Sequence, residues 1–374
     1  MYSLLKPLLF KFDPEKAHDI AMGFLATASK NPLLRSLIKS IYGNKVPSLP
    51  VSIMGLDFKH PVGLAAGLDK DARAFQTFAA LGFSAVEMGT VTPLPQTGND
   101  KPRMFRLTED RAIINRMGFN SGGIQNFLLN FQPFTESAKN NITGHTNNKT
   151  AAGINIGKNK LTSNENAVDD YLKALRAVYA KADYITINIS SPNTESLREL
   201  QGEEPLMQLL KALSEERIKL ATEQRIHIPI ALKIAPDLNS TEIRVIAELL
   251  IEYQFDALIA TNTTIERPES LESEHKNETG GLSGAILKQQ ATDVIAEFYT
   301  HLQGKVPIIG VGGIETADDA WQKMLAGADF VQIYSGLIYH GPKMIREIVT
   351  GLAEKTAGYD SLADALSAHR AKQN

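Results

Sequence analysis

The chain of 374 residues contains no cysteine. Disulfide bonds, thiolate metal sites and a cysteine acting as nucleophile or base are therefore excluded. The absence also agrees with a reducing compartment, where disulfides are rare.

Long apolar runs and an excess charge of one sign are missing as well. No stretch approaches the roughly 20 consecutive apolar residues that a membrane-spanning helix needs. The N-terminus does not follow the pattern of a signal peptide or of an Arg-rich transit sequence. The 39 Lys and Arg face 42 Asp and Glu, a net charge of −3, so nothing favours a nucleic-acid partner. We expect a globular protein of a bacterial cytoplasm.

Several catalytic motifs are also absent. The sequence has no G-x-G-x-x-G, which leaves a Rossmann dinucleotide site unsupported, and Gly157-Lys158 lacks the rest of a Walker pattern. The eight histidines show no metal-binding spacing, and no Ser-His-Asp set is visible.

Residues 1–45 differ from the rest of the chain. Apolar residues recur there at helical spacing in three short stretches. Asp13-Pro14 and Asn31-Pro32 each supply an N-cap followed by proline at the first helical position. Seven Lys and Arg face three Asp and Glu, so this segment is basic. It either packs on the main domain, which the residues alone favour, or lies on an anionic membrane surface.

From residue 61 onward, apolar runs rich in β-branched residues alternate with helix-like stretches such as 166–179, 204–219, 241–253 and 316–326. Eight such units predict the α/β fold of a (β/α)8 TIM barrel over residues 46–352, followed by a polar helical tail at 353–374. An open doubly wound sheet is the alternative, but it usually has fewer strands and a Gly-rich first turn. The predicted strands are Pro61–Gly67, Ala85–Thr90, Ala151–Gly157, Tyr184–Ser190, Ile228–Ile234, Ala257–Thr263, Val306–Gly313 and Phe330–Ser335.

Polar residues gather at the ends of these predicted strands. Because the C-terminal ends of barrel strands build one active site, we expect these side chains to meet at the barrel mouth. Long connections at 91–150 and 264–282 would lie at the same end. The polar residues are Asp69, Lys70, Thr90, Asn155, Asn188, Lys233, Asn262, Thr263, Tyr334 and Ser335.

The last two predicted strands end in glycine-containing turns, Gly312-Gly313 and Tyr334-Ser335-Gly336. Loops at these positions bind phosphate in many barrels, although a tight turn without a ligand is the alternative. We favour phosphate binding because both loops carry suitable residues. A phosphate site without a metal motif indicates a phosphorylated substrate or cofactor, which would carry any redox chemistry.

Six short motifs, taken in order and spacing, closely resemble those of dihydroorotate dehydrogenases, the flavoenzymes of pyrimidine synthesis. The resemblance covers residues 1 to about 352. The motifs are Ala65–Asp71 (AAGLDKD), Asn115–Asn120 (NRMGFN), Asn188–Thr194 (NISSPNT), Thr261–Thr264 (TNTT), Gly280–Gly284 (GGLSG) and Val311–Ile314 (VGGI).

The resemblance extends to the class of enzyme. Soluble members use a cysteine as base and lack N-terminal helices, whereas this chain has Ser191 and a 45-residue extension. It therefore resembles the quinone-dependent, membrane-associated class 2. The resemblance implies oxidation of (S)-dihydroorotate to orotate in de novo pyrimidine (UMP) biosynthesis, with Ser191 taking the C5 proton and one FMN per subunit taking the hydride. It also implies electron transfer to a membrane quinone through residues 1–45, peripheral association with the cytoplasmic face of the bacterial inner membrane, and a monomer.

The resemblance further implies residue roles. The residues expected at FMN are Ala66, Gly67, Leu68, Asp69, Lys70, Thr90, Asn155, Asn188, Lys233, Thr261, Gly284, Gly313, Tyr334 and Ser335. Those expected at the pyrimidine are Lys70, Asn115, Arg116, Met117, Gly118, Phe119, Asn188, Asn193, Asn262 and Thr263. His18 and Arg106 are expected near the quinone tunnel.

Elementary chemistry agrees with these roles. Lys70 can pair with the carboxylate of dihydroorotate, and the asparagines match its amide-like edges. Lys233 suits the flavin edge that becomes negative on reduction. The alternatives are another FMN barrel, such as an α-hydroxy-acid oxidase or a soluble dehydrogenase using fumarate or NAD, and a membrane-surface binding protein without activity. Ser191 taken alone would be a capping serine in a Ser-Ser-Pro turn.

Overall fold

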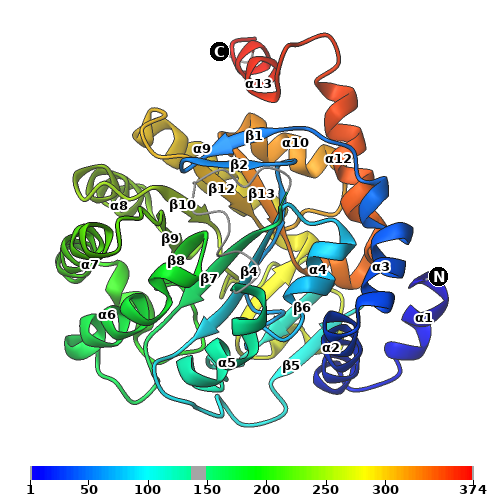
Figure 1. Cartoon of the computed structure of the whole chain (residues 1–374), viewed down its shortest axis with the longest axis horizontal. Coiled ribbons are helices and arrows are strands. Elements are labelled where there is room, and N and C mark those ends of the chain that lie inside the picture. The colour runs from blue at the N-terminus through cyan, green and yellow to red at the C-terminus, as the bar shows by residue number, and fades with distance from the viewer. Residues whose placement is uncertain (1, 136–148, 373–374) are drawn as a thin grey trace.

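A closed barrel of eight parallel strands forms the centre of the molecule in the computed structural model, which describes residues 2–135 and 149–372. The strands follow the spatial order β10-β12-β13-β3-β4-β7-β8-β9 (Figure 1). All eight predicted runs are barrel strands, so the predicted fold class is confirmed. The strands are β3 (Val62–Leu64), β4 (Ala85–Val91), β7 (Ala151–Ile156), β8 (Tyr184–Asn188), β9 (Ile230–Ile234), β10 (Ala257–Ala260), β12 (Ile308–Val311) and β13 (Phe330–Ile333).

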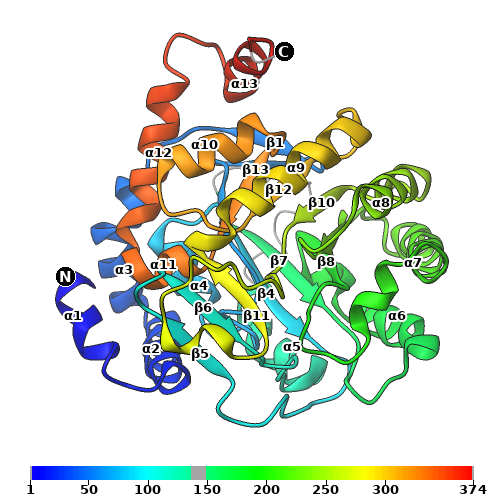
Figure 2. The same cartoon turned by 180° about the vertical axis from the view of Figure 1, so that it is seen from behind.

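Helices surround this barrel, as Figures 1 and 2 show from opposite sides. The four helix-like stretches predicted from sequence are α6, α7, α8 and α10, with ends shifted by at most a few residues. The helices after the N-terminal segment are α4 (Phe75–Leu81), α5 (Gly123–Thr135), α6 (Ala167–Val178), α7 (Glu203–Gln224), α8 (Ser240–Glu252), α9 (Lys288–Leu302), α10 (Ala317–Leu325), α11 (Ser335–His340), α12 (Lys343–Lys355) and α13 (Leu362–Arg370).

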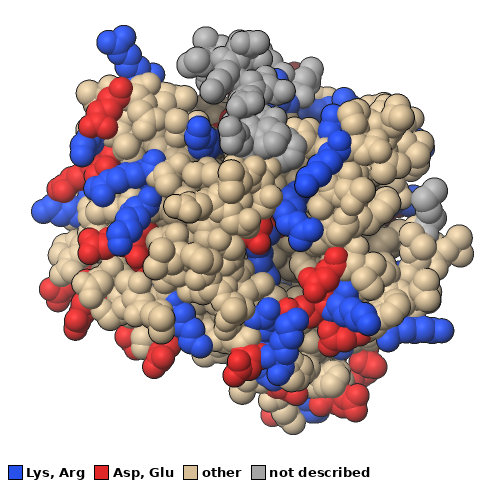
Figure 3. Space-filling view, turned by 60° about the horizontal axis from the view of Figure 1, so that its bottom comes forward, with Lys and Arg blue, Asp and Glu red and all other residues tan. Residues whose placement is uncertain are grey.

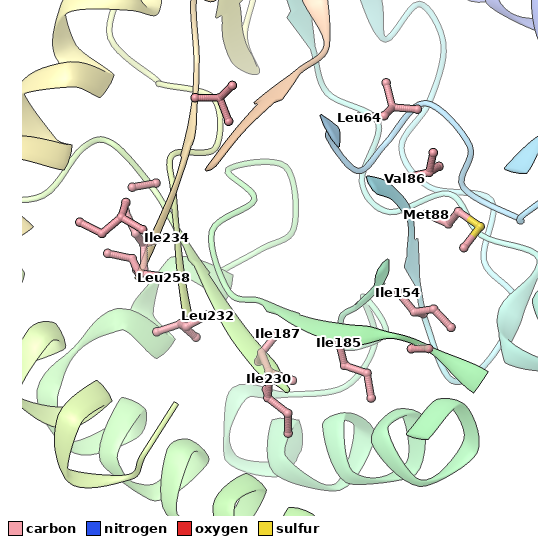
Figure 4. Close-up of a cluster of buried hydrophobic side chains, with 14 of the residues drawn as sticks. Leu64, Val86, Met88, Ile154, Ile185, Ile187, Ile230, Leu232, Ile234 and Leu258 are labelled. Atoms are coloured by element: carbon pink, nitrogen blue, oxygen red, sulfur yellow. The ribbon is translucent and has the colours of Figure 1, made fainter. Parts of the chain in front are cut away.

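Successive residues of each strand point alternately toward the helices and into the barrel. The outward set is apolar and fully buried against the helices, and Figure 4 shows part of it. The inward positions carry the polar residues, including Glu87, Asn155 and Lys233. The strand period therefore places the larger hydrophobic core between the strands and the helices, and puts these polar groups inside the barrel together with a smaller apolar cluster. The outward residues labelled in Figure 4 are Leu64, Val86, Met88, Ile154, Ile185, Ile187, Ile230, Leu232, Ile234 and Leu258.

A short hairpin closes the N-terminal end of the barrel. Its strands are β1 (Val51–Ile53) and β2 (Leu56–Phe58), which pair antiparallel. Phe58 packs on Phe330 of β13 with 4.8 Å between ring centroids. This apolar plug leaves the opposite end as the accessible mouth.

A second sheet stands at the mouth and joins the two long connections. Its order is β11-β6-β5, from β5 (Met104–Leu107), β6 (Ala112–Asn115) and β11 (Gly281–Gly284). The connection at 264–282, predicted as loop, is irregular except for the 3-10 turn η5 (Glu274–Asn277) and the start of β11. The predicted long connection at 91–150 includes residues 136–148, which lie outside the described residues.

The N-terminal segment is helical as predicted. It consists of α1 (Tyr2–Leu9), α2 (Pro14–Lys30) and α3 (Pro32–Ile41), followed by the 3-10 turn η1 (Gly43–Lys45). The side chains of Asp13 and Asn31 cap α2 and α3, each accepting two backbone N–H groups. Helices α2 and α3 lie beside α4 (Figure 1), and α1 contacts α11, which Figure 2 labels. None of the described helices is long and apolar enough to cross a membrane.

The last helix, α13, is attached to the barrel. The Arg370 guanidinium donates to the carbonyls of Met324 and Ala328, and His369 packs edge-on against Trp321 of α10. The polar tail predicted from sequence is therefore a docked helix.

Candidate functional site

One cavity of about 700 Å³ extends from the mouth of the barrel to the N-terminal helices. Its inner part is lined by the polar residues at the strand ends, and its outer part by apolar residues of α1, α2 and α3. A polar chamber and an apolar passage are thus parts of one space.

The residues predicted to hold FMN lie in two layers. Twelve line the cavity: Ala66, Gly67, Leu68, Lys70, Thr90, Asn188, Lys233, Thr261, Gly284, Gly313, Tyr334 and Ser335. Asp69 and Asn155 lie behind this surface. The Asp69 carboxylate accepts the N–H groups of Arg73 and Ala74 at 2.8 Å each and so orders the turn after Lys70.

Asn155 links two of the lining residues. Its side-chain oxygen accepts hydrogen bonds from the Thr90 hydroxyl and, at 3.1 Å, from the Asn188 amide. The Asn188 amide also donates to the Thr90 hydroxyl at 2.9 Å. These bonds leave little rotational freedom to the polar floor of the cavity.

Glu87 is a functional candidate that the sequence reasoning missed. It is fully buried inside the barrel, where its carboxylate accepts hydrogen bonds from Asn155 (2.8 Å), Gln332 (2.7 Å) and Tyr184 (3.3 Å). Its Oε1 lies 3.9 Å from Nζ of Lys233. Burial lowers the pKa of Lys233 and the negative charge of Glu87 opposes this shift. A lone acidic residue in an otherwise apolar predicted strand was the available signal.

The residues predicted to meet the pyrimidine gather in the same chamber, with one exception. Nine line the cavity: Lys70, Asn115, Met117, Gly118, Phe119, Asn188, Asn193, Asn262 and Thr263. The Arg116 side chain is engaged elsewhere, donating to Glu278 at 2.7 Å and lying over the Phe105 ring.

Ser191 lies on the loop after β8 and is 6% exposed. Its hydroxyl oxygen accepts the N–H of Asn193 at 3.2 Å. The preceding Ser190 donates to the side-chain oxygen of Asn188 at 2.9 Å and accepts from the Asn262 amide at 3.0 Å. Thr194, three residues after Ser191, has a buried hydroxyl that makes no hydrogen bond within the described chain.

Burial also acts on two ionisable groups facing the cavity. It lowers the pKa of Lys70 to about 8, assisted by the positive charge of Arg103. It lowers the pKa of His18, on α2, to about 4, assisted by Lys70. At neutral pH the cavity therefore contains a lysine that is mainly charged and, on α2, a neutral imidazole.

Arg106, from β5, lines the passage beneath α1. Its guanidinium lies 4.1 Å from the Phe10 ring centroid and donates to the Phe10 carbonyl at 3.2 Å. Phe10 in turn packs edge-on against Tyr339 of α11, with centroids 5.7 Å apart. The structure thus places both predicted quinone-tunnel residues, His18 and Arg106, on the cavity wall.

The loops predicted to bind phosphate form another part of the wall. Gly313, in one of these loops, has a φ of +71°, and Gly284, at the end of the neighbouring β11, has a φ of +111°, conformations that favour glycine. A Cβ at Gly313 would lie 2.5 Å from the Lys288 backbone. The hydroxyls of Ser283 and Ser335 are 2.9 Å apart and join this loop region to β11.

The outer surface carries both charge signs. Lys and Arg are interspersed with Asp and Glu over the face shown in Figure 3, without a broad field of one sign. Within the described residues, no group of three or more His, Asp or Glu could hold a metal ion.

Comparisons with known proteins match nearly the whole chain. A family model described as "Dihydroorotate dehydrogenase" matches residues 48–356. Proteins named "Dihydroorotate dehydrogenase (quinone)" from Idiomarina loihiensis and Shewanella oneidensis are 48% and 49% identical, covering 94% and 93% of this chain and 100% and 98% of their own. A crystal structure titled "DHODH in complex with ferulenol from Eimeria tenella" is 41% identical, covers 96% of each chain and has a TM-score of 0.86. The chain therefore belongs to the dihydroorotate dehydrogenase family, in its quinone-dependent class.

Proposed function

We propose that the chain oxidises (S)-dihydroorotate to orotate in de novo pyrimidine (UMP) synthesis and passes the electrons through FMN to a membrane quinone. The supporting observation is the continuous cavity, which joins a polar chamber containing Ser191, Lys70 and Lys233 to an apolar passage among α1, α2 and α3. A pyrimidine anion and an apolar quinone need these two environments.

The residues present suit FMN, one per chain. The cavity wall contains glycines with positive φ at 67, 284 and 313, conformations that favour glycine, and Gly313 belongs to one of the loops where barrels bind phosphate. Lys233 lies on the wall with an acidic partner no closer than 3.9 Å, so its ammonium has donors left for a ligand. Bound FMN would accept the hydride and deliver electrons to quinone. The chain would hold its phosphate at the glycine loops and its polar edge at Lys233.

The chamber also suits dihydroorotate. Lys70 supplies a positive charge for its carboxylate. Amide donors and acceptors come from the ends of β6 and β8 and from the loops after β8 and β10, at Asn115, Asn188, Asn193 and Asn262. The hydroxyl of Ser191 stands among them and would take the C5 proton of the substrate. A serine hydroxyl is a weak base unless its own proton moves on. The buried hydroxyl of Thr194, which has no hydrogen-bond partner among the described residues, would receive that proton through a water molecule.

The N-terminal helices would supply the quinone entrance and the membrane contact. Large apolar side chains are exposed on all three helices and on the link after α1, together with the basic residues of the segment. Apolar faces combined with basic residues favour peripheral binding to an anionic bilayer, here the cytoplasmic face of a bacterial inner membrane. The protein would act there as a monomer. The exposed apolar residues are Leu4, Leu5, Leu8, Phe12, Ile20, Phe24, Leu33 and Leu37.

Rapid-mixing absorption spectroscopy tests this function. The purified protein should carry the yellow colour of flavin, dihydroorotate should bleach it without oxygen, and a short-chain quinone should restore it. Restoration by NAD or fumarate instead of quinone would contradict the acceptor. A colourless protein without turnover would favour a binding protein.

The role of Ser191 is tested in the first half-reaction. Ser191→Ala should retain FMN and slow bleaching by dihydroorotate about 10²-fold or more, the usual contribution of a positioned base. Reoxidation by quinone should stay at the wild-type rate, which serves as the internal control. Bleaching at a normal rate would remove Ser191 from the proposed role.

A further inference from the structure

Arg198 lies between the loops after β8, β9 and β10, next to the proposed pyrimidine site, but its side chain does not line the cavity. It belongs to the 3-10 turn η4 (Leu197–Gln201) after the Ser191 loop. Its side chain is 19% exposed. No sequence motif named above distinguishes it among the 39 Lys and Arg.

Three atoms of its guanidinium engage three different loops. Nε donates to the Ser190 carbonyl at 3.0 Å, after β8. Nη2 donates to the Thr263 carbonyl at 2.7 Å, after β10. Nη1 donates to the Asp237 carboxylate at 2.6 Å, after β9. A planar guanidinium fixes the relative directions of its donors, so these loops cannot move independently without breaking a bond.

Asp237 extends the same connection. Its carboxylate also accepts the hydroxyl of Thr264 and, at 3.2 Å, the N–H of Ile265. Both members of the Arg198–Asp237 pair therefore bind the loop after β10, Arg198 at Thr263 and Asp237 at the next two residues. Because the charges of Arg198 and Asp237 cancel, the pair has little electrostatic effect on the substrate carboxylate that Lys70 is proposed to bind.

The atoms held are next to the proposed chemistry. The Ser190 carbonyl belongs to the peptide group whose nitrogen is that of Ser191, so fixing this group sets the direction of the Ser191 side chain. The Thr263 carbonyl follows Asn262, whose amide donates to Ser190 at 3.0 Å. The guanidinium thus controls the spacing between Ser191 on one loop and Asn262 and Thr263 on another.

We propose that Arg198 is a positioning residue, which aligns Ser191 with a pyrimidine held by Asn262 and Thr263 through hydrogen bonds to the carbonyls of Ser190 and Thr263. This inference rests on the proposed function. Misplacement of a reacting group by about 1 Å can cost a factor of 10² in rate, so the effect should be measurable.

The test compares Arg198→Ala and Arg198→Lys with the wild type in three measurements. These are the rate of flavin bleaching by dihydroorotate, the orotate dissociation constant by calorimetry, and the rate of reoxidation by quinone. For Arg198→Ala we expect bleaching about 10²-fold slower, orotate binding about tenfold weaker, and reoxidation within twofold of wild type. Arg198→Lys should recover only part of the loss, because one ammonium cannot bridge two carbonyls and a carboxylate.

Chemical rescue separates positioning from general loss of structure. Free guanidinium at tens of millimolar should raise the bleaching rate of Arg198→Ala at least tenfold, whereas methylammonium should not. Guanidinium should not rescue Ser191→Ala. Arg176→Ala is the matched control, because Arg176 pairs with Glu216 at 2.7 Å between the outer helices α6 and α7. It should behave as wild type in all three measurements.

The outcomes distinguish the two proposals. Slow bleaching by Ser191→Ala with Arg198→Ala within threefold of wild type would overturn the role of Arg198 alone. Normal bleaching by Ser191→Ala would remove Ser191 as the base, and with it the group that Arg198 is proposed to align, whereas a wild type that dihydroorotate does not bleach would overturn the proposed function itself. If Arg198→Ala loses its flavin, the test rests on Arg198→Lys. Bleaching at least tenfold slower than in the wild type, with flavin retained, supports the inference. An unchanged bleaching rate refutes it.

Discussion

Two lysines supply the positive charge of the chamber, and their surroundings differ. Lys233 has the buried carboxylate of Glu87 3.9 Å from its ammonium. Lys70 has no ion pair of this kind within the described residues, and burial lowers its pKa to about 8. An ammonium that is half-buried in the cavity wall and has no ion pair gains most from an anionic ligand, which agrees with its proposed role at the substrate carboxylate.

The Lys70 pKa gives a specific pH dependence for orotate binding. Below about pH 8 the ammonium form predominates and the dissociation constant should be constant. Above that pH the proton must be restored on binding, so the dissociation constant should rise toward tenfold per pH unit. Isothermal titration between pH 6 and 10 measures this. Lys70→Gln should bind orotate more weakly, and its dissociation constant should no longer change slope near pH 8. A change of slope that persists in the variant would show that another group titrates there.

Only some residues of the site could be recognised from the sequence. Ser191 and the asparagines follow predicted strands within recognisable motifs. Glu87 has a physical signal, since an acid in a buried strand needs partners. Arg198 has none, because its role depends on carbonyls 8 and 65 residues away in the chain. Arg116 belongs to a motif, yet its side chain pairs with Glu278 instead of facing the cavity.

At the scale of elements, prediction succeeded where the signal was local. Strands buried on both faces read as apolar runs, and Asp13-Pro14 and Asn31-Pro32 marked the starts of α2 and α3. The hairpin β1–β2 was not predicted because each strand has only three residues. The β6–β11 pairing was not predicted because it joins Asn115 to Gly281, which are far apart in the sequence. Such contacts are set by tertiary structure and not by local pattern.

The exposed leucines of α1 and α3 give a prediction for membrane binding. Leu33 is 82% exposed and does not line the cavity, so Leu33→Ser should weaken binding to anionic vesicles without narrowing the passage. Loss of one buried leucine costs about 1.5 kcal/mol, or roughly tenfold in the partition coefficient. Vesicle sedimentation measures the partition coefficient.

Leu161→Ser is the matched control for Leu33→Ser. Leu161 is 98% exposed on the loop after β7 and does not belong to the N-terminal helices. Its substitution should leave vesicle binding unchanged, and both variants should reduce a water-soluble quinone at the wild-type rate. Equal binding by Leu33→Ser and wild type would place the membrane contact elsewhere.

At the scale of the whole molecule, buried ionisable groups make the free energy of unfolding depend on pH. Burial lowers the pKa of His60 to about 4, although the Gly82 carbonyl 2.8 Å from its Nε2 opposes the shift. Burial raises the pKa of Asp69 to about 6. Acidification through this range therefore increases the free energy of unfolding through Asp69, whereas it decreases it through His60. The net slope of the wild type therefore mixes both signs, and a variant is needed to isolate one group.

His60→Gln isolates the contribution of His60, because glutamine keeps a donor and an acceptor but does not titrate. Between pH 6.5 and about 4 the unfolded chain binds a proton that folded His60 does not, so this contribution to the free energy of unfolding is intact above pH 6.5 and decreases as the pH falls. The slope should be about 1.4 kcal/mol per pH unit at most, and smaller where the site relaxes. Urea unfolding at several pH values should therefore show a gap between wild type and His60→Gln that narrows on acidification. His275→Gln is the control, because the His275 side chain is 42% exposed. If the difference in unfolding free energy between wild type and His60→Gln stays constant with pH, His60 becomes protonated without unfolding and the prediction is wrong.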